Sequence, residues 1–167
     1  GHESVAHLAG PGDWLESRAR ARGWRRALRR SGHRGERRTA VVLGEGDWSA
    51  RSGYEIGRSM LRGPHPTAIF AANDQMALGL LRAVDEAGLR APQDISVVGF
   101  DDVPEAAFFT PPLTTVHQDF FELGRRAMDL IARALDGDAA ARTTSVAPVL
   151  VVRASTGPPS SRSTARR

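Results

Sequence analysis

The stretch TAIFAANDQMALGLL, residues 67–81, decides the fold of this chain of 167 residues. It opens with an apolar run, TAIFAA, of the kind that forms a central parallel strand covered on both faces. A helix is predicted to follow over 74–87, since its apolar residues recur at helical spacing and Gly88 stands where a helix C-cap belongs. The apolar stripe of this helix consists of Met76, Leu80, Leu81 and Val84. A buried strand that leads into an amphipathic helix is the building unit of an α/β fold.

Short apolar runs alternate with helical segments on both sides of this stretch, which predicts a mostly parallel sheet with helices on both faces. The further strands are predicted at 4–8, 39–43, 95–100, 113–117 and 146–152. The further helices are predicted at 14–30, 49–61 and 120–135. Ser49 and Asp119 suit the N-caps of the last two helices, and Glu122 completes a capping-box pattern with Asp119.

The composition excludes several classes of protein. No cysteine is present, which removes disulfides, thiolate catalysis and the cysteine-based zinc sites. No window approaches the ~20 consecutive apolar residues that a membrane-spanning helix needs. The first residues show no secretory signal. We therefore expect one domain with a cytoplasmic location and without a metal or cofactor.

The positive charge is concentrated near the N-terminus. All 23 basic residues are arginines, and ten of them fall between Arg18 and Arg38. Such a run can bind phosphate groups through counterion release. It can also be a solvated helix face, and we favour this interpretation because no aromatic residues or base-reading motif accompany the arginines.

Polar and aromatic residues follow the predicted strands at the points where the strands end. These positions hold Trp48, Asn73 and Asp74, Asp101 and Asp102, and Gln118. In an open α/β sheet the ligand crevice lies beyond the carboxyl ends of the strands. Carboxylates accept and amides both donate and accept hydrogen bonds, which suits hydroxyl groups, and the tryptophan ring can cover a pyranose face. Arg20 of the first helix would complete a polyol site.

Each of these residues also has a structural interpretation. Asn73 is also a suitable cap for the helix at 74–87 and need have no further role. Asp101 and Asp102 are also ordinary turn residues, and Trp48 can belong to the core. The enzyme alternative is weaker, because the motifs of serine hydrolases, P-loop proteins and zinc proteases are missing. A triad of Ser52, His117 and Asp101 can be drawn, but nothing in the spacing favours it.

Several longer motifs occur at these same segments, and their order and spacing carry a resemblance. They are Gly46-Asp47-Trp48-Ser49-Ala50, the run ANDQMALG at 72–79, the run DISVVGFDD at 94–102, and the run PPLTT at 111–115. With them the chain resembles the lactose-repressor (LacI/GalR) family of transcription repressors over nearly residues 1–153. The family's intact members begin with a helix-turn-helix headpiece that binds operator DNA.

The resemblance implies a periplasmic-binding-protein-like fold of two α/β lobes that close on a small effector, commonly a sugar. Residues 1–118 would form most of the C-terminal lobe, and 119–145 would hold a crossover helix that belongs to the N-terminal lobe. Residues 146–154 would return to the C-terminal lobe, and 155–167 are expected to be a disordered tail because of their Pro, Ser, Thr and Arg content. The headpiece and most of the N-terminal lobe are expected to be missing ahead of Gly1, so half of the cleft would be absent.

The resemblance also assigns roles to individual residues. The implied effector-binding residues are Arg20, Trp48, Asn73, Asp101, Gln118 and Phe120. The implied dimer-interface residues are Met76, Leu80, Phe109 and Pro111. Gln118 and Phe120 would sit where the chain crosses between the lobes, and the shared Trp and Asp favour a galactoside-like ligand.

The sequence therefore predicts the effector-binding and dimerisation portion of a LacI-type transcriptional repressor, which contacts operator DNA only through a headpiece that the chain lacks. In an intact relative the effector would shift the population between two lobe arrangements. One alternative is a stand-alone sugar-binding protein. Another is a dimerisation partner of a full-length repressor. With half of the cleft missing, sugar binding by this chain is expected to be weak.

Overall fold

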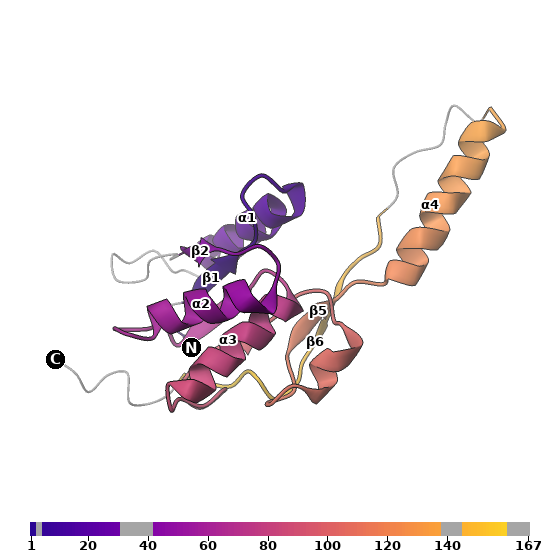
Figure 1. The fold of residues 1–167 in the computed structure, drawn as a ribbon. Coiled ribbons are helices and arrows are strands. Elements are labelled where there is room, and N and C mark those ends of the chain that lie inside the picture. Colours follow the sequence, from indigo (N-terminus) through magenta and orange to yellow (C-terminus); the bar gives the residue numbers. More distant parts are fainter. Residues whose placement is uncertain (3–4, 31–41, 138–144, 160–167) are drawn as a thin grey trace.

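The computed structural model describes residues 1–2, 5–30, 42–137 and 145–159. Its strands are β1 (Val5–Ala9), β2 (Val42–Glu45), β3 (Ala68–Ala71), β4 (Ser96–Val98), β5 (Thr115–His117) and β6 (Val149–Val151). Its helices are α1 (Leu15–Arg30), α2 (Ala50–Met60), α3 (Asp74–Glu86), the 3₁₀ helix η1 (Pro104–Phe108) and α4 (Phe120–Leu135). The predicted elements are present, with ends displaced by a few residues (Figure 1). The expected strand residues 39–41 and the last three arginines of the basic run, Arg34, Arg37 and Arg38, lie outside the described residues.

The first four strands form a parallel sheet in the order β2-β1-β3-β4. In the register of β1 with β3, Val5 lies opposite Ala68 and Leu8 opposite Ala71. β5 and β6 pair antiparallel as a separate ribbon, which joins the edge of the sheet through single bridges from Val98 to Thr114 and from Asp101 to His117. This arrangement confirms the predicted α/β class with a parallel sheet.

Helices cover the sheet on both faces, as burial along β1 shows. Ala6 and Leu8 are buried in the main core cluster together with residues of α3. His7, between them, faces the other way, since side chains alternate along a strand. Its ring centroid lies 5.3 Å from that of Trp24 in α1.

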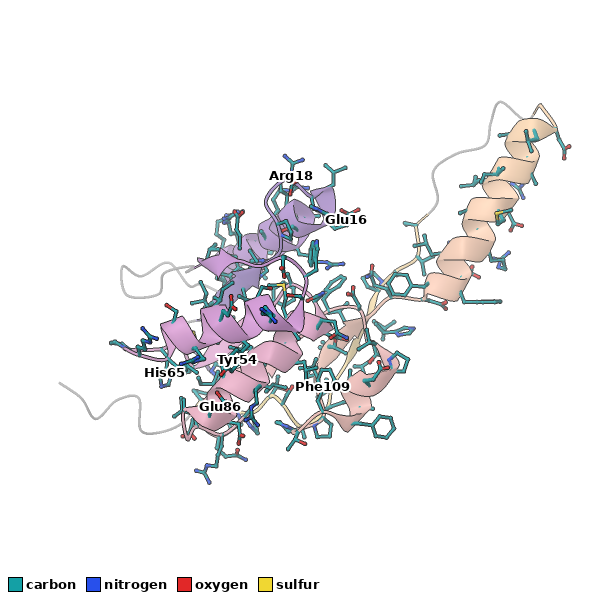
Figure 2. All side chains as sticks on the ribbon, viewed as in Figure 1. Glu16, Arg18, Tyr54, His65, Glu86 and Phe109 are labelled. Atoms are coloured by element: carbon teal, nitrogen blue, oxygen red, sulfur yellow. The ribbon has the colours of Figure 1, made fainter. Side chains whose placement is uncertain are left out.

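α2 and α3 pack against each other at very close range (Figure 1). A Cβ added to Gly53 would collide with the backbone of Met76, and one added to Gly79 would collide with the backbone of Ala50. The two glycines therefore let the helix backbones approach more closely than side chains would permit. Further along, the Tyr54 hydroxyl donates a 2.6 Å hydrogen bond to Glu86, and the two side chains face each other across the helix pair (Figure 2).

The predicted N-caps are confirmed. Ser49 Oγ accepts from the backbone N–H of Ser52 at 3.2 Å, and Asn73 Oδ1 accepts from that of Met76 at 2.9 Å. Asp119 Oδ1 accepts from the N–H of Glu122 at 2.8 Å. These bonds satisfy donors that the first turn of a helix leaves free.

The expected disordered tail is wrong for its described part, residues 155–159. Ser155 is fully buried. Its Oγ donates to the carbonyl of Val97 at 2.6 Å and accepts from the N–H of Thr114 at 2.8 Å. The carbonyl of Gly157 accepts a 3.1 Å hydrogen bond from the hydroxyl of Ser96. These bonds fix the segment against β4, and residues 160–167 lie outside the described ranges.

α4 extends away from the rest of the molecule (Figure 1). None of its residues is buried. Its larger exposed apolar side chains are Phe120, Phe121, Leu123, Met128, Ile131 and Leu135. The helix has the apolar face that the sequence predicts, and that face is not covered by the described part of this chain.

None of the helices in the described ranges combines the length and the apolar character that crossing a bilayer requires.

Candidate functional site

The candidate site lies at the carboxyl ends of the parallel strands and is centred on Asp101. This residue lies three positions after the end of β4, and its backbone N–H donates to the carbonyl of Val116 in β5 at 2.9 Å. Its Oδ1 accepts from the guanidinium of Arg20 at 3.2 Å and from the amide of Gln118 at 2.8 Å. Three residues predicted from separate segments are therefore joined by one carboxylate oxygen.

Arg20 reaches the site from α1 and is fixed at several points. One of its terminal nitrogens donates to the carbonyl of Ala72 at the end of β3, at 2.7 Å. Its guanidinium carbon lies 4.1 Å from the ring centroid of Phe100 and 5.3 Å from that of Trp48. A guanidinium held by an ion pair, a carbonyl and two aromatic rings has little rotational freedom left, which favours recognition of a rigid ligand.

Burial works against both charges of this ion pair. It raises the pKa of the Asp101 carboxyl, and the Arg20 charge and the Gln118 amide oppose that rise. Burial also lowers the pKa of Arg20, chiefly against the attraction of Asp101. The side chain of Asp101 is 23% exposed and that of Arg20 is 12% exposed. Because the two charges compensate each other, this part of the site suits a neutral guest rich in hydrogen-bonding groups.

Asn73 and Trp48 are brought together beside this ion pair. Asn73 caps α3 with its oxygen, and its Nδ2 donates to the backbone carbonyl of Trp48 at 2.9 Å. Asn73 is 8% exposed. The structural interpretation of Asn73 as a cap is therefore confirmed, and the same side chain also fixes the loop that carries Trp48.

Trp48 adopts a left-handed backbone conformation, with φ at 72°. Its indole Nε1 is buried and has no hydrogen-bond partner among the described residues. Its ring packs directly on Gly10, where any added Cβ would collide with the indole. A tryptophan in an unfavourable backbone conformation and with an unused donor is a recurrent mark of a binding site.

Asp102 follows Asp101 but serves the neighbouring structure. Its carboxylate accepts from Arg153 at 2.7 Å and lies 3.1 Å from Nδ1 of His117. Arg153 also donates to the carbonyl of Leu113 at 2.8 Å. Asp102 thus joins the return segment near β6 to the segment that leads into β5, a role that sequence spacing could not reveal.

Asp74 is likewise structural. Its buried carboxylate accepts from the hydroxyl of Thr115 and, at 2.9 Å, from the N–H of Val103. Burial raises its pKa, and these hydrogen bonds oppose the rise. Asp74 therefore fixes the loop after β4 to the start of α3.

The structure does not gather all the predicted residues. Phe120 lies at the first turn of α4 and is 58% exposed. Met76 and Leu80 are completely buried in the core of this chain, so the prediction that they contact a dimer partner is corrected. The apolar stripe that predicts α3 packs into the core with the sheet, so it is not available to a second chain.

The other two predicted interface residues lie next to exposed apolar surface. Phe109 is 8% exposed and Pro111 is half-buried. Neighbouring Phe108 is 85% exposed, and Leu78 on the outer side of α3 is 37% exposed. The sequence analysis names neither of these two exposed residues, although Leu78 stands outside the buried stripe of its helix.

Phe100 and Trp14 were also missed at the site. Phe100 lies under the guanidinium of Arg20, and Trp14 contacts Trp48 edge to face with ring centroids 5.8 Å apart. Phe100 comes two residues after β4, a position that could have identified it, whereas Trp14 lies just ahead of α1 and carries no such signal. A hollow of about 570 Å³ lies where the segments after β1 and β2 meet and is lined by Pro11, Gly12, Asp13, Glu45, Gly46, Asp47 and Ser52.

The triad of Ser52, His117 and Asp101 is not assembled. The Ser52 hydroxyl donates to the carbonyl of Ser49, and His117 faces Asp102 rather than Asp101.

Hydrogen bonds from Ser49 and Ser52 lower the pKa of exposed Asp47 to about 2. No group of three or more potential metal-binding side chains occurs within the described ranges.

Comparisons with known proteins agree with this geometry. A family model described as "periplasmic binding protein-like domain" matches residues 1–156. The lactose operon repressor of Escherichia coli K12 is 42% identical over 157 residues, which cover 93% of this chain and 42% of that protein. The ribose operon repressor of the same strain is 39% identical over 157 residues, with 93% and 47% covered.

Among solved structures, the lac repressor dimer bound to operator and the anti-inducer ONPF superposes with a TM-score of 0.86 at 43% identity. The match covers 93% of this chain and 53% of that chain. The chain spans about half the length of the relatives it matches.

Proposed function

Because this chain belongs to the periplasmic binding protein-like domain family, in its lactose-repressor (LacI/GalR) branch, we propose that it binds a small sugar or glycoside effector. The crevice at Asp101 would hold this effector. The chain would supply effector-binding and dimerisation surfaces to a cytoplasmic transcriptional repressor. The observation that supports the proposal is the joint at Asp101, where Arg20 and Gln118 meet one carboxylate beside Trp48.

The chemistry of this joint suits a polyhydroxylated guest. Asp101 keeps its second carboxylate oxygen as an acceptor, and a sugar hydroxyl can both donate to it and accept from Arg20 or Gln118. Trp48 adds a ring for the apolar face of a pyranose. The names of the two repressors compared above, which refer to the lactose and ribose operons, support a sugar as the ligand class.

α4 supports the proposal that a second lobe closes the crevice. The chain leaves β5 at Gln118, runs out through α4 and returns to β6, and the helix exposes an apolar face. We propose that residues 119–145 pack on an N-terminal lobe and that 1–118 and 146–154 form the C-terminal lobe. Phe120, at the crossing, would then meet the effector from above. Operator DNA would be bound through a headpiece and not by these residues.

The proposal is tested by titrating the 167-residue chain with methyl β-D-galactopyranoside, lactose and D-ribose, with binding followed by NMR. Millimolar affinity for at least one sugar is expected, since only one side of the crevice is present. Asp101→Asn keeps the shape of the side chain, and Asn, like Asp, is among the non-glycine residues that most often adopt a positive φ, as this position does. It should weaken binding about tenfold or more, because a charged hydrogen-bond acceptor is lost.

The matched control is Arg82→Ala on α3. Arg82 forms an exposed ion pair with Glu86 that is remote from the crevice, so sugar binding should not change. Binding that is equal in the wild type and Asp101→Asn would refute the assignment of the crevice, as would the absence of any sugar binding up to the solubility limit.

A further inference from the structure

The outer side of α1 carries a row of exposed arginines. Successive residues of a helix are turned by about 100°, which brings five arginines within an arc of about 100°. This arginine row consists of Arg18, Arg22, Arg25, Arg26 and Arg29. Arg18 points away from the rest of the molecule (Figure 2). On the opposite side of the helix, the buried Trp24 donates from its indole to the carbonyl of Val5 at 3.1 Å, which fixes the row toward the solvent.

The charges of the arginine row are not compensated by the described part of the chain. Residues three or four apart on a helix are neighbours, so the members of the row repel one another. None of them forms an ion pair with another described residue, and Glu16 is the one acidic residue of α1. On α3, by contrast, the exposed Arg82 pairs with Glu86 at 2.7 Å. The repulsion within the row opposes folding and is relieved when an anion binds.

A hollow of about 590 Å³ lies along the row. It is lined by Arg22, Arg25, Arg26 and Arg29 together with Ala19 and Gly23. A Cβ added to Gly23 would meet no atom within 4 Å, so there is open space beside the long side chains. Guanidinium groups donate pairs of hydrogen bonds to phosphate oxygens, and here several of them border one space. This side of α1 is therefore suited to phosphate groups.

The length of the row favours a polymer over a single phosphate. From Arg18 to Arg29 the helix rises about 16 Å, so the five charges lie on average about 4 Å apart along its axis. One strand of duplex DNA carries a negative charge about every 3.4 Å of its axis. A straight row of cations with nearly this spacing matches the backbone of one strand.

The neighbours of the row distinguish this partner from other anionic ones. Between Arg18 and Arg29, the other exposed residues are Ala19, Gly23 and Ala27. They offer no ring on which the bases of a single strand could stack. They also offer no large apolar side chain that could enter a bilayer, as a helix lying on a membrane requires. Contacts to the backbone of a duplex need neither.

We propose that the arginine row of α1 binds the phosphate backbone of duplex DNA without reading its base sequence. The sequence alone favours a solvated face for these arginines, because no base-reading motif accompanies them. Backbone contacts need no such motif, since their affinity comes from counterion release. The alignment of the arginines on one side of α1 and the hollow along them support this interpretation. The proposal goes beyond the proposed function and does not depend on the crevice at Asp101.

The test is a titration of a fluorescein-labelled duplex of about 20 base pairs with the 167-residue chain, followed by fluorescence anisotropy from about 50 to about 200 mM NaCl. The logarithm of the association constant should fall linearly with the logarithm of the salt concentration, by about 0.9 for each phosphate contacted. Arg22→Gln, Arg26→Gln and Arg29→Gln combined should weaken binding about tenfold or more and make this slope shallower by about 3. Glutamine is also a good helix former, so the variant should fold.

The matched control is Arg51→Gln, Arg58→Gln and Arg62→Gln combined. These arginines are exposed on α2 and the turn after it, on the other face of the sheet. The control loses the same net charge as the test variant and should change the slope by less than about 1. Lysine at the three tested positions of α1 keeps the charge and should keep the slope of the wild type.

Several outcomes would overturn the proposal. One is the absence of duplex binding at about 50 mM NaCl. Another is an equal loss in the two triple variants, since affinity would then follow the net charge and not the row. Equal or tighter binding of a single strand of the same length would overturn the choice of a duplex, and a tenfold preference for one duplex sequence would overturn the backbone contact. The sugar titrations of the crevice are separate measurements, so failure of the arginine row leaves the proposed function standing.

Discussion

At the scale of single residues, His7 is the least expected group in the core. It is fully buried, and its ring stacks on Phe70 with centroids 5.0 Å apart. Its Nδ1 lies 2.9 Å from the carbonyl of Phe70 and donates to it, while its buried Nε2 has no hydrogen-bond partner among the described residues. Protonation at Nε2 would place an uncompensated charge between aromatic rings, so burial lowers the pKa of His7.

This geometry predicts acid lability. In the unfolded chain His7 has an ordinary pKa near 6.5. Because the folded pKa is lower, the unfolded state binds more protons between the two values, and the free energy of unfolding falls as the pH drops below about 6.5. His7→Leu should remove this contribution.

Urea unfolding at pH 7.5 and pH 5 measures the effect. The loss of stability between the two pH values should be smaller in His7→Leu than in the wild type, and His65→Leu, which retains His7, should behave like the wild type. An identical pH dependence in the wild type and His7→Leu would contradict the assignment.

Much of the site could be predicted at the residue scale, and the reason is positional. Residues that follow parallel strands must meet at one edge of the sheet, and this rule identified Trp48, Asn73, Asp101 and Gln118. The rule does not state what each side chain does there. Asn73 also fixes the backbone of Trp48, and Asp102 bonds Arg153, and these roles were not predictable because the partners come from segments that the spacing does not connect.

At the scale of elements, α2 packs on α3 with backbone close to backbone. Gly53 and Gly79 allow it, because a Cβ at either position would meet the backbone of the opposite helix. Neither backbone can move away without separating the helices from the core that Met76 and Leu80 fill. Backbone atoms form this contact, so no flexible side chain can move aside to make room for an added methyl group.

Gly79→Ala should destabilise the fold by about 3 kcal/mol, which is the upper range for overpacking a tight contact. Gly124→Ala is the matched control: Gly124 lies inside α4 with no neighbour within 4 Å of an added Cβ. Alanine there should be neutral or raise stability by up to about 1 kcal/mol, because it is the better helix former. Both values follow from urea unfolding, and equal effects of the two substitutions would rule out the backbone contact as the cause.

The elements themselves were predictable where local signals fix them. Side-chain caps at Ser49, Asn73 and Asp119 and the glycine after α3 mark helix ends within a few residues. The ordered conformation of residues 155–159 was not predictable, because their polar composition suggests disorder. The hydrogen bond that fixes Ser155 runs to Val97, 58 residues away in sequence. Local composition carries no information about partners so distant.

At the scale of the whole molecule, exposed apolar surface remains outside the crevice. Leu78 on α3 and Phe108 on η1 are 37% and 85% exposed. Single exposed apolar residues are common on monomers. We propose a dimer that covers these two residues together with Pro111. The lac repressor dimer, a similar solved structure, supports the assembly of two copies.

We predict that the chain dimerises and that Leu78→Asp combined with Phe108→Asp shifts it to the monomer, since a buried unpaired charge is strongly unfavourable in an interface. Sedimentation velocity over a range of protein concentrations measures this shift. Leu135→Asp on α4 places the same charge on another apolar surface and should leave the association constant unchanged. A wild type that is monomeric at every concentration, or a double variant that still dimerises, would exclude this surface as the interface.

The antiparallel pairing of β5 with β6 has a consequence for how this molecule can be cut. His117 lies opposite Val149, so the chain departs toward α4 and comes back at neighbouring points of one ribbon. The entire excursion between 118 and 148 is topologically an insert in a β-hairpin, and a two-residue Asn-Gly turn of the kind that joins such strands could replace it. A shortened chain of this design would lose Gln118 but keep the ion pair of Asp101 with Arg20 and the tryptophan pair, on a small scaffold that could be re-engineered.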